Sequence, residues 1–173
     1  MQALCKGISE DIDGKLYSID KNGNVRILLD GLRLSNGMEW SLDEKLFYHT
    51  DSDTGIIREY FFDKGSGDIS YSGREVSVPG VDGFTIGNDG CLYVGCWGRG
   101  HVAVVDTKTL TVKSHIEIPA LIPTSCGFMG EGVDMLAITT ADYGSDLEKD
   151  PNAGFTVIQK MEVCGRKPYR FGK

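Results

Sequence analysis

The sequence has no apolar stretch near the roughly 20 residues that a membrane-spanning helix needs. Its amino terminus has no basic segment followed by an apolar one, so we expect no signal peptide. It also has no run of Lys and Arg, and its 18 basic residues are outnumbered by 25 acidic ones, giving a net charge of −7. Nucleic acid is therefore not an expected partner, because binding its phosphates needs clustered positive charge. We expect a cytoplasmic protein that binds neither nucleic acid nor membrane.

Cysteine motifs are also missing. The five cysteines form no CxxC pair, which argues against a zinc ribbon or a redox dithiol. We expect them to remain reduced and to pack as small apolar residues: Cys5, Cys91, Cys96, Cys126 and Cys164. The three histidines are scattered and form no HExxH motif, and no serine-nucleophile elbow is present. We therefore expect neither an HExxH metalloprotease nor a hydrolase built on a serine-nucleophile elbow.

Helical periodicity is absent, because no long window keeps apolar residues at i, i+3, i+4 and i+7. Glycine, by contrast, is abundant at 23 of 173 residues, and it supplies the positive φ angles that tight turns need. Short runs of β-branched and aromatic residues lie between the turns, at 46–50, 57–62, 91–95 and 102–105. These patterns predict an all-β fold.

The expected strands belong to an internal repeat. Residues 36–40 (Asn-Gly-Met-Glu-Trp) and 82–86 (Asp-Gly-Phe-Thr-Ile) each place a Gly nine positions before a Leu. A weaker copy begins at Thr124, so successive copies start 46 and 42 residues apart. The second half of the unit repeats as well, since residues 14–20 resemble residues 100–106. Four short antiparallel strands in about 40–50 residues are typical of a propeller blade.

The repeat predicts one domain over residues 1–173, a partial β-propeller of about 3.5 four-stranded blades. We expect half a blade at 1–34 and blades at about 35–80, 81–120 and 121–173. Propellers close with four or more blades. A half-ring would therefore leave open two faces that are normally buried against neighbouring blades.

Three segments resemble motifs of the gluconolactonase/regucalcin family: 34–41 (Leu-Ser-Asn-Gly-Met-Glu-Trp-Ser), 81–84 (Val-Asp-Gly-Phe) and 123–128 (Pro-Thr-Ser-Cys-Gly-Phe). Residues 150–155 are similar to its last blade, and the resemblance extends over nearly all of 14–172. It implies a six-bladed propeller with one divalent cation in the central channel, and hydrolysis of sugar lactones, typically aldonolactones. Six units of about 45 residues need about 270 residues, so this chain matches only the C-terminal part.

The resemblance also implies particular ligands. In that family the cation is held by an early glutamate, the Asn of an SNG motif and the Asp of a DG motif. The last two carry over as Asn36 and Asp82, whereas the glutamate belongs to a blade that this sequence lacks. Both carried-over residues occupy the same slot of successive repeats, at the start of the innermost strand, and their oxygens suit Ca²⁺, Mg²⁺, Mn²⁺ or Zn²⁺. Thr124 fills this slot in the third copy, beside Ser125. These two hydroxyls and His101 are candidate substrate contacts.

The implied reaction is metal-dependent hydrolysis of a sugar lactone. The cation would polarise the ring carbonyl, Asp82 would ligate it and accept a proton from the attacking water, and Asn36 would only ligate. A homodimer of two half-rings or a complementary half-propeller chain would have to complete the ring. Two alternatives stay open: a catalytically incomplete fragment that acts as a binding or scaffold module through its open edge, and Asn-Gly and Asp-Gly pairs that are simply turns.

Overall fold

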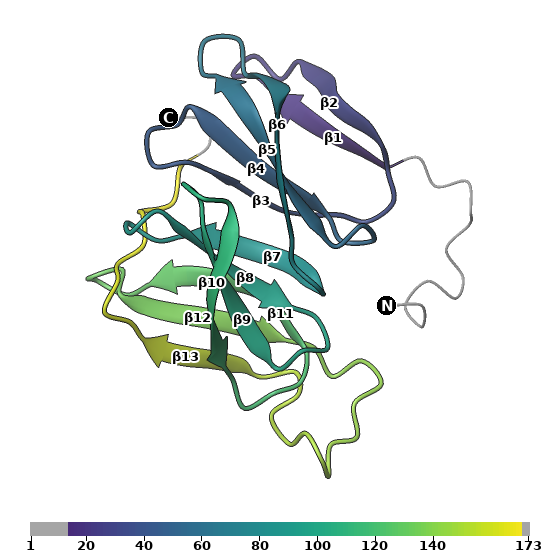
Figure 1. Cartoon of the computed structure of the whole chain (residues 1–173), viewed down its shortest axis with the longest axis vertical. Helices are drawn as coiled ribbons and strands as arrows, with labels where there is room; N and C mark the ends of the chain where they lie inside the picture. The colour runs from purple at the N-terminus through teal and green to yellow at the C-terminus, as the bar shows by residue number, and fades with distance from the viewer. Residues whose placement is uncertain (1–13, 171–173) are drawn as a thin grey trace.

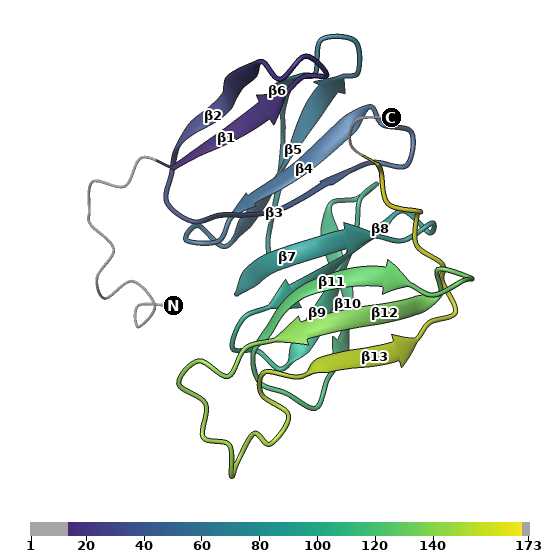
Figure 2. The same cartoon turned by 180° about the vertical axis from the view of Figure 1, so that it is seen from behind.

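The computed structural model describes residues 14–170, which form strands and no α-helix (Figure 1). Within that part of the chain no helix is long and apolar enough to cross a bilayer. The strands form four antiparallel sheets that follow one another in chain order (Figures 1 and 2). The predicted all-β, partial-propeller fold is therefore confirmed.

The first sheet pairs β1 (Gly14–Ile19) with β2 (Val25–Leu32). The second contains, in order, β3 (Ser35–Trp40), β4 (Leu46–Asp51), β5 (Ile56–Asp63) and β6 (Asp68–Ser77). The third repeats that order with β7 (Val81–Ile86), β8 (Cys91–Cys96), β9 (His101–Asp106) and β10 (Thr111–Glu117). The fourth contains β11 (Pro123–Met129), β12 (Met135–Thr140) and β13 (Thr156–Lys160).

The fourth sheet differs from the expected four-stranded pattern, because its described part has three strands. After β13 the chain leaves the sheet and crosses the ends of the inner strands β11, β7 and β3. Gly165 forms a bridge with Gly87, just beyond β7, and Arg166 forms an ion pair with Glu39 of β3. The Tyr169 ring then packs edge-on against Trp40, with 6.1 Å between ring centroids. Residues that sequence reasoning assigned to a last blade thus tie three sheets together.

The core lies in three layers between successive sheets. All six residues of β8 are buried, because sheets pack against both faces of this strand. The outermost strand of the same sheet, β10, is mostly exposed. Cys91, Cys96 and Cys126 are buried, Cys164 is half-buried, and these four are not in disulfides. Cys5 lies outside the described residues.

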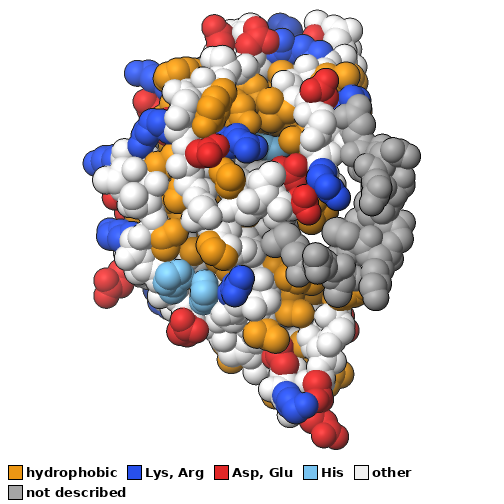
Figure 3. All heavy atoms as spheres, turned by 45° about the vertical axis from the view of Figure 1, so that its right-hand side comes forward, with side chains coloured by type: hydrophobic (Ala, Val, Ile, Leu, Met, Phe, Trp, Pro, Cys, Tyr) orange, Lys and Arg blue, Asp and Glu red, His pale blue; other side chains and the backbone are white. Residues whose placement is uncertain are grey.

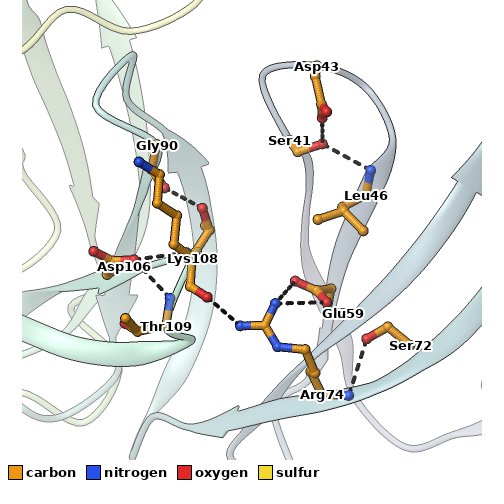
Figure 4. Close-up of polar contacts among 11 residues, drawn as sticks. Ser41, Asp43, Leu46, Glu59, Ser72, Arg74, Gly90, Asp106, Lys108 and Thr109 are labelled. Atoms are coloured by element: carbon orange, nitrogen blue, oxygen red, sulfur yellow. Dashed lines mark hydrogen bonds and ion pairs between the residues drawn. The ribbon is translucent and has the colours of Figure 1, made fainter.

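A polar bridge joins the second and third sheets near their outer strands (Figure 4). Glu59 of β5 is only 2% exposed, and its Oε2 lies 3.2 Å from Arg74 Nη1. Arg74 Nη2 donates a 2.7 Å hydrogen bond to the carbonyl of Lys108, in the β9–β10 turn. Asp106 Oδ1 holds that turn by accepting the Lys108 and Thr109 N–H groups. One arginine therefore neutralises a buried carboxylate and links two sheets.

The inner strands approach one another where glycine removes the side chain. Strand β7 lies between β3 and β11 (Figure 2). A Cβ at Gly37 would lie 2.6 Å from the Asp82 carbonyl oxygen, and one at Gly83 would lie 2.6 Å from Ser125 Cβ. Both distances are too short for real contacts, so a larger residue at either position would push neighbouring sheets apart.

We therefore expect Gly83→Ala to lower the free energy of unfolding by about 1–3 kcal/mol, the usual effect of overpacking. Gly127→Ala is the matched control, because it also lies on an inner strand, has no positive φ, and a Cβ there would meet nothing within 4 Å. Urea denaturation of both variants measures the difference. Equal midpoints for the two variants would contradict close strand packing at Gly83.

A second prediction concerns His49, which is 2% exposed and lies 3.0 Å from Ser35 Oγ through Nε2. Burial lowers the pKa of His49 to about 4, whereas an unfolded histidine titrates near 6.5. The unfolded state therefore binds more protons below about pH 6.5, and stability is lost as the pH falls.

Between pH 7 and pH 5, His49 should remove about 1–2 kcal/mol of stability from the parent protein. His49→Gln stays neutral throughout, so its free energy of unfolding should fall by that much less over the same interval. Urea denaturation at both pH values tests this. The same pH-dependent loss in parent and variant would show that His49 is not buried in its neutral form.

Candidate functional site

Asn36, Asp82 and Thr124 are each the second residue of an inner strand, β3, β7 and β11. In each case the pairing with the next strand shifts register at this point, between residues 35 and 38, 81 and 84, and 123 and 125. Such bulges redirect side chains and are frequent beside active sites. All three residues are half-buried. The structure therefore repeats one local geometry at the three positions.

The alternative interpretation of Asn36-Gly37 and Asp82-Gly83 as turns is wrong, because both pairs lie within strands. Their glycines instead allow close contact between strands, a role that sequence reasoning missed. The signal was present in the repeat, where each of these glycines precedes a Leu by nine positions. That spacing reveals a repeated structural position, but it does not reveal which neighbouring strand the glycine contacts.

Asn36 and Asp82 are brought into direct contact. Burial raises the pKa of Asp82 to about 6, although hydrogen bonds donated by the Asn36 side chain and by the Gly83 N–H act to lower it. Asp82 forms no ion pair with any residue of 14–170. The site therefore holds a half-buried carboxylate that has an amide partner but no positive charge to balance it.

The hydroxyl groups of the third copy have different surroundings. Ser125 Oγ lies against the backbone of β7, since a Cβ on Gly83 would be only 2.2 Å from it. Thr124 Oγ1 lies 2.7 Å from Thr139 Oγ1 and so is engaged with β12. Ser125 therefore packs against the residue that follows Asp82, whereas the Thr124 hydroxyl contacts a strand of its own sheet.

The structure places His101 elsewhere. It begins β9, opposite Cys96 of β8 on one side and Glu117 of β10 on the other. Strand β8 therefore separates His101 from β7, and its ring contacts His115 rather than an inner strand. We expected His101 near the channel because it belongs to a glycine-rich loop. It lies instead two strands away from the inner strand β7.

The donor chemistry of the pair fits a hard cation. A carboxylate and an amide carbonyl supply oxygen ligands that suit Ca²⁺ or Mg²⁺ and are acceptable to Mn²⁺ or Zn²⁺. A cation would also neutralise the uncompensated charge of Asp82. Over residues 14–170, no three His, Cys, Asp or Glu side chains gather to hold a metal. A cation at this position would therefore need oxygen ligands beyond Asn36 and Asp82.

Comparison with known proteins gives related sequences and structures. Residues 3–142 match the family described as SMP-30/Gluconolactonase/LRE-like region. Regucalcin of Danio rerio is 32% identical over 170 residues, covering 92% of this chain and 57% of that protein. The chain thus spans little more than half the length of this curated relative.

Solved structures agree with the fold. A regucalcin from Agrobacterium tumefaciens, described as a calcium-binding protein, superposes with a TM-score of 0.78 at 23% identity, covering 88% of this chain and 54% of that one. A gluconolactonase from Xanthomonas campestris superposes with a TM-score of 0.61 at 25% identity, covering 75% of this chain and 42% of that one. The Agrobacterium likeness, at this identity, shows the fold alone.

The unbalanced charge of Asp82 predicts a measurable effect on stability. Because its pKa is raised in the folded state, ionisation destabilises the native protein as the pH rises from about 4 to about 6. In EDTA at pH 7, Asp82→Asn should be about 1–2 kcal/mol more stable than the parent, allowing for solvent screening. At pH 4 the two should be equal. Urea denaturation at both pH values tests this, and a variant less stable at pH 7 would contradict it.

Proposed function

The chain belongs to the SMP-30/gluconolactonase/LRE-like family, and we propose that it carries the cation-binding part of an enzyme that hydrolyses sugar lactones. The observation that supports this most directly is the contact between Asn36 and Asp82 on adjacent inner strands. These two equivalent repeat positions would supply oxygen ligands to one cation. The gluconolactonase relative favours a lactone as the substrate class, and the calcium-binding relative favours Ca²⁺ as the first cation to test.

In the proposed reaction, Asp82 accepts a proton from a water molecule whose oxygen attacks the lactone carbonyl carbon. The ring carbon–oxygen bond then breaks, and the ring oxygen leaves as a hydroxyl after gaining a proton, which gives a hydroxy acid. An ionised carboxylate can accept this proton, and a cation bound beside Asp82 would keep it ionised by lowering its pKa below the value of about 6 in the cation-free protein. A bound divalent cation would polarise the carbonyl as a Lewis acid.

The remaining residues would position the substrate. Asn36 cannot act as a base, so its amide would orient the Asp82 carboxylate and supply a second ligand. We assign the Ser125 hydroxyl, and secondarily Thr124, to contacts with a substrate hydroxyl or with water. Both belong to the inner strand β11, which lies against β7.

The first sheet shows that the ring is incomplete over the described residues. Strand β1 corresponds in the repeat to β9, yet within residues 14–170 it pairs only with β2. A cavity of about 620 Å³ lies beside it, lined in part by Leu16, Met38 and Trp40. We propose that a second half-ring, from a homodimer or from a complementary half-propeller chain, covers this open side and supplies the missing ligand.

A binding or scaffold module is the second candidate function. It is favoured by an exposed apolar surface on β1 and β2, where Tyr17 lies opposite Ile27 and Ile19 lies opposite Val25. These four side chains are 52–60% exposed, and a contiguous apolar patch usually marks an interaction surface. This surface could bind a protein partner without any catalysis.

A lactonase assay separates the two functions. The full chain, treated with EDTA and then supplied with Ca²⁺, Zn²⁺, Mg²⁺ or Mn²⁺, should hydrolyse gluconolactone faster than the buffer blank. Asp82→Asn should lower the rate by about 10²–10⁴, the usual contribution of a general base. Asp30→Asn is the matched control, because it removes one exposed carboxylate on β2.

Light scattering of the same samples makes a negative result informative. The proposed lactonase would be refuted if a stable dimer hydrolysed no lactone with any of the cations. Full activity of Asp82→Asn would refute it as well. A folded, inactive monomer would favour the binding module.

A further inference from the structure

A second group of ionisable side chains lies outside the inner strands, at a cavity of about 260 Å³. Its apolar walls include Val78 and Pro79, in the connection between β6 and β7. Its polar lining consists of Arg99, in the β8–β9 loop, with His101 of β9 and His115 of β10. The cavity therefore lies where the second and third sheets meet, and its lining includes neither Asn36 nor Asp82.

The two histidines form a close pair. Their ring centroids are 4.3 Å apart and the rings are inclined at 65°. His101 donates one ring N–H to the Arg99 backbone carbonyl, so its other ring nitrogen can donate a hydrogen bond only when the imidazole is protonated. A pair of histidine side chains with a basic side chain beside it is visible on the surface in Figure 3.

The positive charge of Arg99 is not balanced by an ion pair with any residue of 14–170. Burial lowers the pKa of His101, and the nearby charges of His115 and Arg99 lower it further, whereas Glu117 acts in the opposite direction. Burial also raises the pKa of the Cys96 thiol to about 11, so this lining residue stays neutral. The chain has a net charge of −7. At this cavity, however, one unpaired guanidinium and two imidazoles have a single carboxylate nearby.

We propose that this cavity binds a small oxyanion, a carboxylate or phosphate group, held by Arg99 and by the imidazole of His115, with His101 as a further donor when it is protonated. The guanidinium can donate two parallel hydrogen bonds to either group, because its planar fork matches their oxygen spacing. The apolar wall formed by Val78 and Pro79 would accommodate a short carbon stem. The cavity is smaller than the usual drug-sized pocket of about 300–1,000 Å³, which favours a ligand of few atoms. The site is separate from the proposed lactonase centre and does not depend on it.

Histidine NMR provides a direct test, since the chain contains only three histidines and His49 is buried. Inorganic phosphate and gluconate are titrated separately into the full chain, with sodium chloride at matched ionic strength as the reference. Saturable shifts of the His101 and His115 Hε1 signals, with His49 unmoved, are expected with at least one oxyanion. A response to only one of them identifies the group as phosphate or carboxylate.

Substitutions show whether Arg99 provides the binding charge. Arg99→Gln should weaken binding at least 10-fold, whereas Lys113→Gln should change it less than 2-fold. Lys113 is the matched control because it is on the same strand as His115, but its charge acts on Asp106 and Cys91. If the His49 signal shows that Arg99→Gln disturbs the fold, His115→Gln provides the same test. Shifts no larger than those with chloride, or parent-like binding by Arg99→Gln, would overturn the proposal.

Discussion

The close approach of the inner strands at Gly37 and Gly83 is the constraint on which the rest of the structure depends. Because neither residue has a Cβ, β7 can lie directly against β3 and β11. This contact places Asp82 within hydrogen-bonding reach of Asn36 and places Ser125 beside the same backbone. The glycines thus account both for the packing of the sheets and for the assembly of the candidate site.

Two further sets of contacts hold the sheets in this arrangement. Near the outer strands, Arg74 neutralises the buried Glu59 and bonds to the next sheet through Lys108 (Figure 4). At the carboxyl ends of the inner strands, the segment after β13 contacts three sheets, notably through the ion pair of Arg166 with Glu39. The candidate site lies at the opposite ends of these strands. It is therefore built where the sheets are fixed by strand packing rather than by the C-terminal segment.

Much of the fold and part of the candidate site could be predicted from the sequence, because both are repeated along it. The spacing of Gly, Leu and polar residues identified the inner strands and made Asn36 and Asp82 equivalent. The last unit was less predictable, because its three strands and the long crossing to Glu39 depend on contacts between residues far apart in sequence. The pairing of His101 with His115 could not be predicted either, since it depends on the register of β9 and β10.

We propose above that Asn36 and Asp82 together form a cation site. A crystal structure of the full chain grown with Mn²⁺, in which anomalous scattering locates the ion, would test this. We expect an anomalous peak at about 2.0–2.6 Å from an oxygen of Asp82 and from the amide oxygen of Asn36. A structure at saturating Mn²⁺ in which these two side chains bond only to each other, with any ion elsewhere, would contradict it.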